Sequence, residues 1–218
     1  MNRLSLVFAA VSLVAVMGCN SSAPATSSDS KTAQSAPKTV PAPDGTMVDT
    51  SDFSLVLPKT WEAVDFGDKE LVSSMEAAWA KDEKLKGMIP QIKQMQANGS
   101  IKLFAFDKDT LGKGFATNIN VIVLDQMAVP LEKLVEANVT QMKSMANADI
   151  KTSNLKGKNC DVALLDWGMK NANGDLHFFT CLAIKGSKNY TLTFTTKEGE
   201  QEKLRKTMET VASTLELK

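Results

Sequence analysis

Two periodicities of apolar residues divide the chain after residue 50 into predicted strands and helices. Strands alternate apolar and polar side chains, whereas helices repeat apolar side chains every three or four residues. The alternation predicts strands at 53–57, 61–66, 102–106, 117–124, 161–169, 176–185 and 190–196. Helical spacing predicts helices over 68–79, over 85–97 with a kink at Pro90, from Pro130 to Met145 and over 198–215.

Short turns connect the last three predicted strands, at Asn171–Gly174 and at Gly186–Asn189. Strands joined in this way are antiparallel, so we expect an α+β fold, an α/β/α sandwich with helices flanking a mainly antiparallel sheet. In the strand 190–196, Tyr190, Leu192 and Phe194 alternate with three threonines. This pattern predicts one apolar and one more polar sheet face.

The N-terminal 18 residues have the layout of a signal peptide. Arg3 precedes an apolar stretch, Leu4–Met17, that would span about 21 Å as a helix, short of the ~30 Å membrane core. The stretch ends in Val16-Met17-Gly18-Cys19, which resembles the bacterial lipobox. The resemblance implies cleavage after Gly18 and lipid on Cys19, which would anchor the chain to a membrane. The alternative is an ordinary cleaved signal with an incidental cysteine.

Residues 19–50 are rich in Ser, Thr, Ala and Pro, and their only large apolar residues are Val40, Met47 and Val48. Such a segment buries too little surface to offset its ordering entropy. We therefore expect a disordered tether with a reach of ~30 Å. The folded domain is expected to cover residues 51–218, long enough for one substantial core.

Charge narrows the choice of partners. The 25 basic residues balance the 25 acidic ones, and no long basic run occurs, so we expect no nucleic-acid partner. Once a signal peptide is removed, Arg205 is the only arginine left. A cluster of arginines for binding phosphate is therefore not expected.

His177 is the only histidine, and it lies in a predicted strand beside Phe178 and Phe179. It is either a catalytic base or metal ligand, or a half-exposed strand residue, and the second interpretation is favoured. The sequence contains no HExxH, GxSxG, CxxC or phosphate-binding loop. We therefore expect no enzymatic activity, no catalytic residue, no metal site and no cofactor.

Asp107–Gly112 faintly resembles a calcium loop, but Leu111 and Asn118 occupy two ligand positions, so a turn is favoured. Methionines on predicted helices could bind copper, although packing between helix and sheet explains them better. They are Met75, Met88, Met95, Met142, Met145 and Met208. Three acids lie at the start of the last helix, Glu198, Glu200 and Glu202. We expect them to interact favourably with the positive end of the helix dipole.

Cys160 and Cys181 could form a disulfide in an oxidising compartment. A two-residue turn at Asn173-Gly174 would place Cys181 opposite Asp166, about 20 Å from Cys160 along the strand. Disulfide geometry needs Cα atoms within about 7 Å. Two free thiols are therefore the favoured interpretation, and a disulfide is the alternative.

The order of several short motifs resembles the PsbP-like family, which includes bacterial lipoproteins of the DcrB and LpqN types. The motifs are Phe53–Trp61, Asn118–Val121, Leu155–Gly157, Asn189–Phe194 and Val211–Leu215. They cover residues 51–217, nearly the whole expected domain. The resemblance implies an α/β/α sandwich, and it implies no shared catalytic residues because these relatives differ in function.

Together these features predict a lipid-anchored cell envelope protein that binds or scaffolds another envelope protein without catalysis. The alternative is a carrier or sensor of a small apolar ligand held between sheet and helices, with 85–97 as a lid. A hydrolase acting through His177 is the third possibility. Asn20 follows Cys19, which by resemblance to enterobacterial sorting favours the outer membrane.

Overall fold

A computed structural model describes residues 38–42, 44–64, 98–110, 115–125, 128–146, 149–170 and 174–218 of the chain. Its strands are β1 (Lys38–Ala42), β2 (Gly45–Asp49), β3 (Phe53–Pro58), β4 (Trp61–Ala63), β5 (Ile101–Asp107), β6 (Asn118–Asp125), β7 (Lys151–Lys156), β8 (Asp161–Met169), β9 (Leu176–Lys185), β10 (Lys188–Lys197) and β11 (Glu216–Leu217). Its helices are α4 (Leu131–Ala146), α5 (Gln201–Thr214) and a short 3₁₀ turn at Lys108–Thr110. The expected helices at 68–79 and 85–97 lie outside the described residues.

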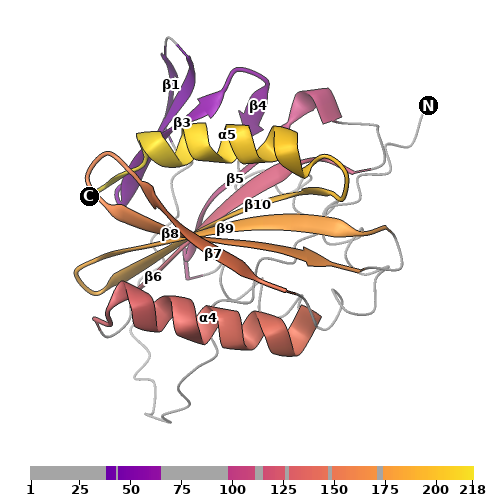
Figure 1. Cartoon of the computed structure of the whole chain (residues 1–218). Coiled ribbons are helices and arrows are strands. Elements are labelled where there is room, and N and C mark those ends of the chain that lie inside the picture. Colours follow the sequence, from indigo (N-terminus) through magenta and orange to yellow (C-terminus); the bar gives the residue numbers. More distant parts are fainter. Residues whose placement is uncertain are drawn as a thin grey trace.

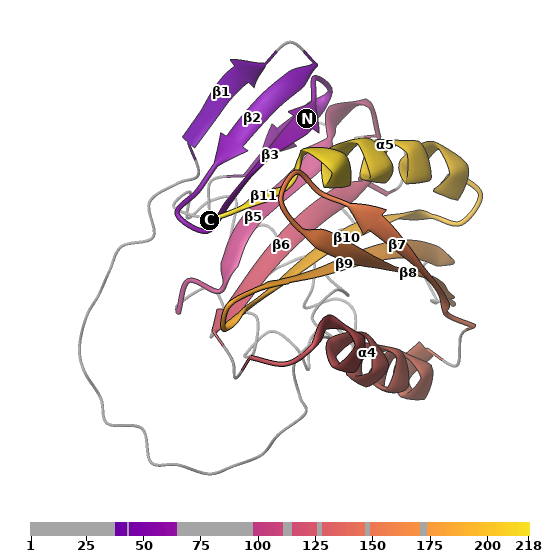
Figure 2. The same cartoon turned by 60° about the vertical axis from the view of Figure 1, so that its left-hand side comes forward.

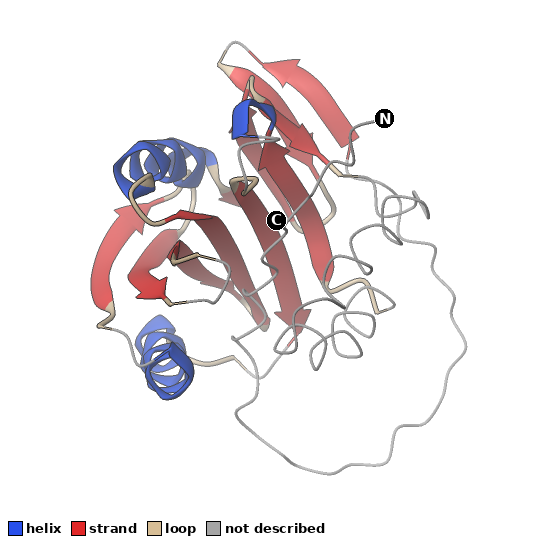
Figure 3. Ribbon diagram, turned by 90° about the vertical axis from the view of Figure 1, so that its right-hand side faces the viewer, coloured by secondary structure: helices blue, strands red, loops and turns tan. Residues whose placement is uncertain are grey.

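The strands form two sheets in which every pairing is antiparallel. A seven-stranded sheet has the order β4-β5-β6-β10-β9-β8-β7, and a smaller sheet has the order β1-β2-β3-β11. Helix α5 lies on one face of the large sheet and α4 on the other (Figures 1 and 3). This arrangement confirms the predicted α+β fold with helices flanking an antiparallel sheet.

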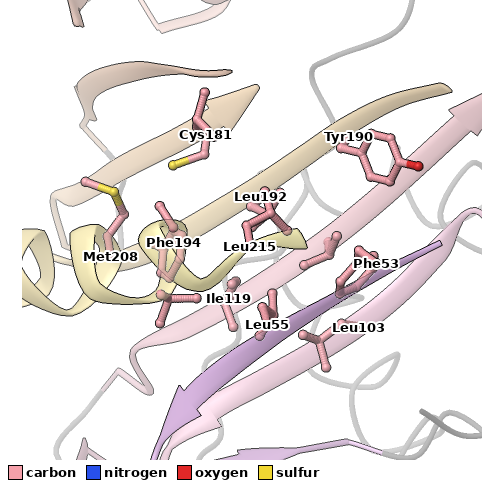
Figure 4. Close-up of a cluster of buried hydrophobic side chains, with 14 of the residues drawn as sticks. Phe53, Leu55, Leu103, Ile119, Cys181, Tyr190, Leu192, Phe194, Met208 and Leu215 are labelled. Carbon is pink, nitrogen blue, oxygen red and sulfur yellow. The ribbon is translucent and has the colours of Figure 1, made fainter. Parts of the chain in front are cut away.

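The central strand β10 pairs with β6 along one edge and with β9 along the other, and its side chains are buried on both faces. Its Tyr190, Leu192 and Phe194 join the core between α5 and the two sheets, together with Met208 and Leu215 (Figure 4). The threonines between them point to the α4 side. The alternation expected from the sequence therefore separates an apolar face from a more polar one.

The folded domain begins earlier than residue 51, so the expected end of the tether at residue 50 is wrong. Strands β1 and β2 form a hairpin that continues into β3 (Figure 2). Val48 has 0% exposure and pairs with Leu55. At Gly45 a Cβ would lie 1.9 Å from the Leu57 carbonyl oxygen, so only glycine fits. Residues 45–49 therefore belong to the sheet although most of the surrounding segment is polar, because Val48 is buried and Gly45 contacts β3 closely.

Strand β7 is a second element that the apolar pattern misses. Its sequence, Lys-Thr-Ser-Asn-Leu-Lys, is mostly exposed, and it pairs with β8 at the end of the large sheet. An edge strand buries little side-chain surface, so its residues show no apolar alternation. Helix α5 is also shorter than expected, since it begins at Gln201 and leaves Glu198 outside.

Cys160 and Cys181 are both free, as favoured by the sequence. The register behind that expectation is nevertheless wrong, because the last pair of β8 and β9 is Met169 with Leu176. The connection is therefore longer than a two-residue turn, and Cys181 faces Leu164 rather than Asp166.

Asp52 connects the two sheets just before β3. Lys188 donates to its carboxylate at 2.6 Å, and the Lys102 ammonium lies 3.1 Å away. Burial alone would raise the pKa of Asp52, but the hydrogen bonds from these two lysines outweigh it and keep that pKa below its usual range. The Asp52 carbonyl also accepts from the Tyr190 hydroxyl and the Lys218 amide. This carboxylate holds the β3 end of the small sheet against β5 and β10.

Val48 provides a test of where the folded domain begins. Val48→Ala should lower the free energy of unfolding by about 1–2 kcal/mol, because it removes buried methyl groups. Met47→Ala is the matched control, since Met47 is 36% exposed and should change stability by less than about 0.5 kcal/mol. Urea denaturation of the two variants measures the difference. Equal effects would mean that residues 45–49 are not part of the folded domain.

Candidate functional site

The only histidine and Arg205 lie together at one end of the large sheet. The His177 Nε2 atom is 2.7 Å from an oxygen of Asp166, and its Nδ1 atom is 3.2 Å from an oxygen of Glu198. The Arg205 guanidinium donates to the other oxygen of Asp166. These four residues come from β9, β8, the segment before α5, and α5 itself.

Local structure explains why these side chains meet. His177 pairs with Gly168 on β8, where an added Cβ would lie 3.7 Å from the Glu198 carboxylate. The Arg205 guanidinium lies 4.9 Å from the centre of the Phe179 ring, which positions it toward Asp166. The side chains of Asp166 and His177 are only 11% and 14% exposed. The side chains of this cluster therefore contact one another at the margin of the core.

The geometry of this cluster does not favour catalysis by His177. A general base needs a ring nitrogen free to accept a proton, and both nitrogens here face carboxylates. The two carboxylates contact opposite nitrogens and so cannot share a metal ion with the ring. Within the described ranges, no group of three metal-binding side chains occurs.

A surface groove lies at the other end of β7, next to the turn between β7 and β8. Its volume is about 650 Å³. Leu131, Leu155, Ile184 and Leu217 supply its apolar lining. Its charged groups are Glu132, Lys156, Asp161 and Lys185. This mixture of apolar floor and polar rim is common in surfaces that bind proteins.

The backbone of β7 adds a second feature to this groove. In the described part of the chain, β7 pairs only with β8, so its outer edge presents unpaired amide and carbonyl groups. Such an edge can accept an extended segment of another protein as an added strand. The groove places apolar side chains beside that edge, where alternate side chains of an added strand would lie.

Neither Cys160 nor Cys181 is suited to nucleophilic chemistry. Burial raises the pKa of the Cys181 thiol to about 12. Burial also raises the pKa of Cys160, which lies in the groove with its sulfur 4.0 Å from the Leu215 carbonyl oxygen. A thiolate is the reactive form, so both residues are better suited to packing.

The other residues singled out from the sequence take structural positions. Asp107 is buried and accepts a hydrogen bond from the Asp109 amide at the 3₁₀ turn. Met142 packs on the α4 side of the sheet and Met208 on the α5 side, so these two do not form one cluster. Gly18 and Cys19, with Met75, Met88 and Met95, lie outside the described residues. The β7 edge was missed because a polar edge strand leaves no pattern in the sequence.

The fold defines an α+β sandwich domain with an open sheet edge. A family model named PsbP matches residues 46–217, and the chain belongs to the PsbP family. The match begins within β2, before the expected boundary at residue 51.

Two solved structures are similar to this chain. LpqN of Mycobacterium tuberculosis, involved in cell envelope biogenesis, is 8% identical, with a TM-score of 0.53 over 76% of this chain and 82% of its own. The cyanobacterial PsbP of Synechocystis is 13% identical, with a TM-score of 0.48 over 88% of this chain and 98% of its own. No curated protein sequence matches this chain significantly. At 8% identity, the similarity to LpqN shows a shared fold only.

Asp166 offers a test of the ion cluster. Asp166→Asn should reduce the free energy of unfolding by about 2–3 kcal/mol, because His177 and Arg205 both lose a charged acceptor. Glu198→Gln is the matched control, since the Glu198 side chain is 48% exposed and should contribute less than about 1 kcal/mol. Denaturation at pH 7 measures both. Similar losses in the two variants would contradict the idea that Asp166 stabilises the fold more than Glu198 does.

Proposed function

We propose that this protein is a non-catalytic, lipid-anchored component of the bacterial cell envelope that binds another envelope protein through the groove beside β7. The observation that carries the proposal is the open edge of β7 next to an apolar groove of about 650 Å³. An edge strand supplies main-chain affinity, and the adjacent apolar lining supplies selectivity for side chains.

Two observations support a place in the envelope. The sequence Val16–Cys19 resembles a lipobox after an apolar stretch too short to span a membrane. LpqN, which has a similar fold, is involved in cell envelope biogenesis.

None of the described helices is long and apolar enough to cross a membrane. Asn20 after Cys19 favours the outer membrane for the anchored chain.

The absence of catalysis is supported by the chemistry of the described side chains. Both nitrogens of His177 face carboxylates, and both thiols are disfavoured as thiolates. The alternative function, transport or sensing of an apolar ligand, finds less support. Packed side chains fill the α5 side of the sheet, as Leu192, Phe194 and Met208 are fully buried.

Cys19 tests the anchor. Cys19→Ser should move the protein from the membrane fraction to the soluble fraction, because the serine hydroxyl does not receive the lipid. Stable anchoring needs several acyl chains, and the variant would carry none. Ser21→Ala is the control, since it lies two residues away and should leave the protein on the membrane. Membrane fractionation with immunoblotting measures the distribution. A membrane-bound Cys19→Ser protein would contradict lipid anchoring.

Asn154 tests the proposed interface. A photo-crosslinking residue at this exposed position of β7 should form a specific covalent adduct with one envelope protein in living cells. The same residue at Glu209, exposed on α5, is the control and should form no such adduct. Immunoblotting detects the adducts, and mass spectrometry identifies them. Identical adducts from both positions, or none from position 154, would rule out the β7 groove as the interface.

A further inference from the structure

The pairing of β7 with β8 assigns each residue of β7 to one face of the large sheet. Leu155 lies opposite Val162, which belongs to the core under α5. Neighbouring residues of a strand point to opposite faces, so the row toward α4 consists of Thr152, Asn154 and Lys156. All three are exposed, because α4 packs mainly against β8 and β9. This row of β7 is therefore accessible to a partner.

The groove beside β7 lies next to this exposed row. Asn154 and Lys156 line it from β7, whereas Leu131 and Glu132 line it from the start of α4. Ile184 of β9 adds an apolar side chain to the lining. A strand added outside β7 would place every second side chain on the α4 side of the sheet. An apolar side chain opposite Asn154 would face Leu131 and Ile184.

Strand β7 has a lysine at each end and no acidic residue. The first of these, Lys151, lies opposite Asp166 in the ladder. The two oxygens of Asp166 already contact His177 and Arg205. Among the described residues, Lys151 therefore has no carboxylate partner.

The lysine at the other end, Lys156, is weakly paired. It contacts Asp161, but the two side chains are 82% and 69% exposed, and such a pair contributes little stability. An ammonium group has three donors, so Lys156 can bind a second carboxylate. Lys185 of the groove donates to the Leu217 carbonyl oxygen rather than to a carboxylate. The edge therefore presents positive charge that the fold neutralises only in part.

The two lysines of β7 also indicate which kind of strand can pair here. If β7 paired along its full length with β7 of a second copy, Lys151 of each copy would lie opposite Lys156 of the other. Like charges directly opposite each other are destabilising, and lysines on edge strands protect against self-association. A strand with acids at these two positions is attracted at both ends instead.

We propose that the β7 edge binds an extended, acidic segment of its partner, which joins the large sheet as an antiparallel strand. This inference rests on the proposed function and specifies the partner. Every strand pairing of the described sheets is antiparallel, which is also the more stable arrangement. The segment carries an acid opposite each lysine and an apolar residue opposite Asn154. Its sequence pattern is an acid, any residue, an apolar residue, any two residues and a second acid.

Two peptides test this specificity on the purified full chain in an amine-oxide detergent. The acidic probe is Ser-Glu-Thr-Val-Thr-Thr-Glu-Ser, and the basic probe has lysine in place of both glutamates. Fluorescence anisotropy should show that the acidic probe binds at least about fivefold more tightly, because two opposite-charge pairs replace two like-charge pairs. Raising NaCl to about 0.5 M should reduce this difference. Equal affinities, or no measurable binding of the acidic probe, would overturn the proposal.

Charge reversal at the edge provides a second test. Lys151→Glu combined with Lys156→Glu should reverse the preference, so that the basic probe binds more tightly. The matched control combines Lys59→Glu with Lys108→Glu, two exposed positions near β4 and β5 at the opposite edge of the large sheet. It changes the net charge equally and should leave the preference unchanged. Damage to the edge would weaken both probes rather than reverse their order. A retained preference for the acidic probe, or a reversal in the control, would refute the acidic segment.

Crosslinking from position 154 in cells separates this inference from the proposed function. The adduct should fall about fivefold or more when Lys151 and Lys156 are both replaced by glutamate. An adduct of unchanged yield would leave the proposed function standing and would exclude an acidic partner segment. Absence of an adduct from the natural chain would overturn the proposed function and this inference together.

Discussion

The structure depends above all on strand β10, which pairs on both sides and is buried on both faces. Because successive side chains of a strand point to opposite faces, each residue of β10 is committed to one layer of the sandwich. Tyr190, Leu192 and Phe194 anchor the core under α5. A shift of one residue would bury threonines under α5 and aromatic rings under α4, so the pairing register is strongly determined.

The same constraint decides which groups are available for function. The α5 layer is closed by apolar side chains, and its charged margin is occupied by the contacts of Asp166 with His177 and Arg205. Both ring nitrogens of His177 therefore contact carboxylates within the fold. The open edge of β7 is left for binding, because it has no strand partner on its outer side in the described part of the chain.

Most of the fold could be predicted because burial leaves a pattern in buried strands. The strands at 53–58, 118–125, 161–169 and 176–185 were located within a residue or two. Strands β2 and β7 were missed because they bury few side chains. The Cys160 and Cys181 register was misjudged because the last pair of β8 and β9 is Met169 with Leu176, two residues out of step with a two-residue turn at Asn173-Gly174. Of the candidate site, the sequence located His177 but neither of its carboxylate partners.

By itself, the sequence determined the antiparallel α+β architecture, the two-faced character of β10 and the lipobox-like segment ending at Cys19. These are local properties, set by side-chain period and by short motifs. Only the tertiary structure decided which distant groups meet: Asp166 with Glu198 around His177, Asp52 with Lys188, and Asn118 with Thr195. Such contacts depend on strand order and register, which arise from pairing between segments far apart in the chain and leave no local signal.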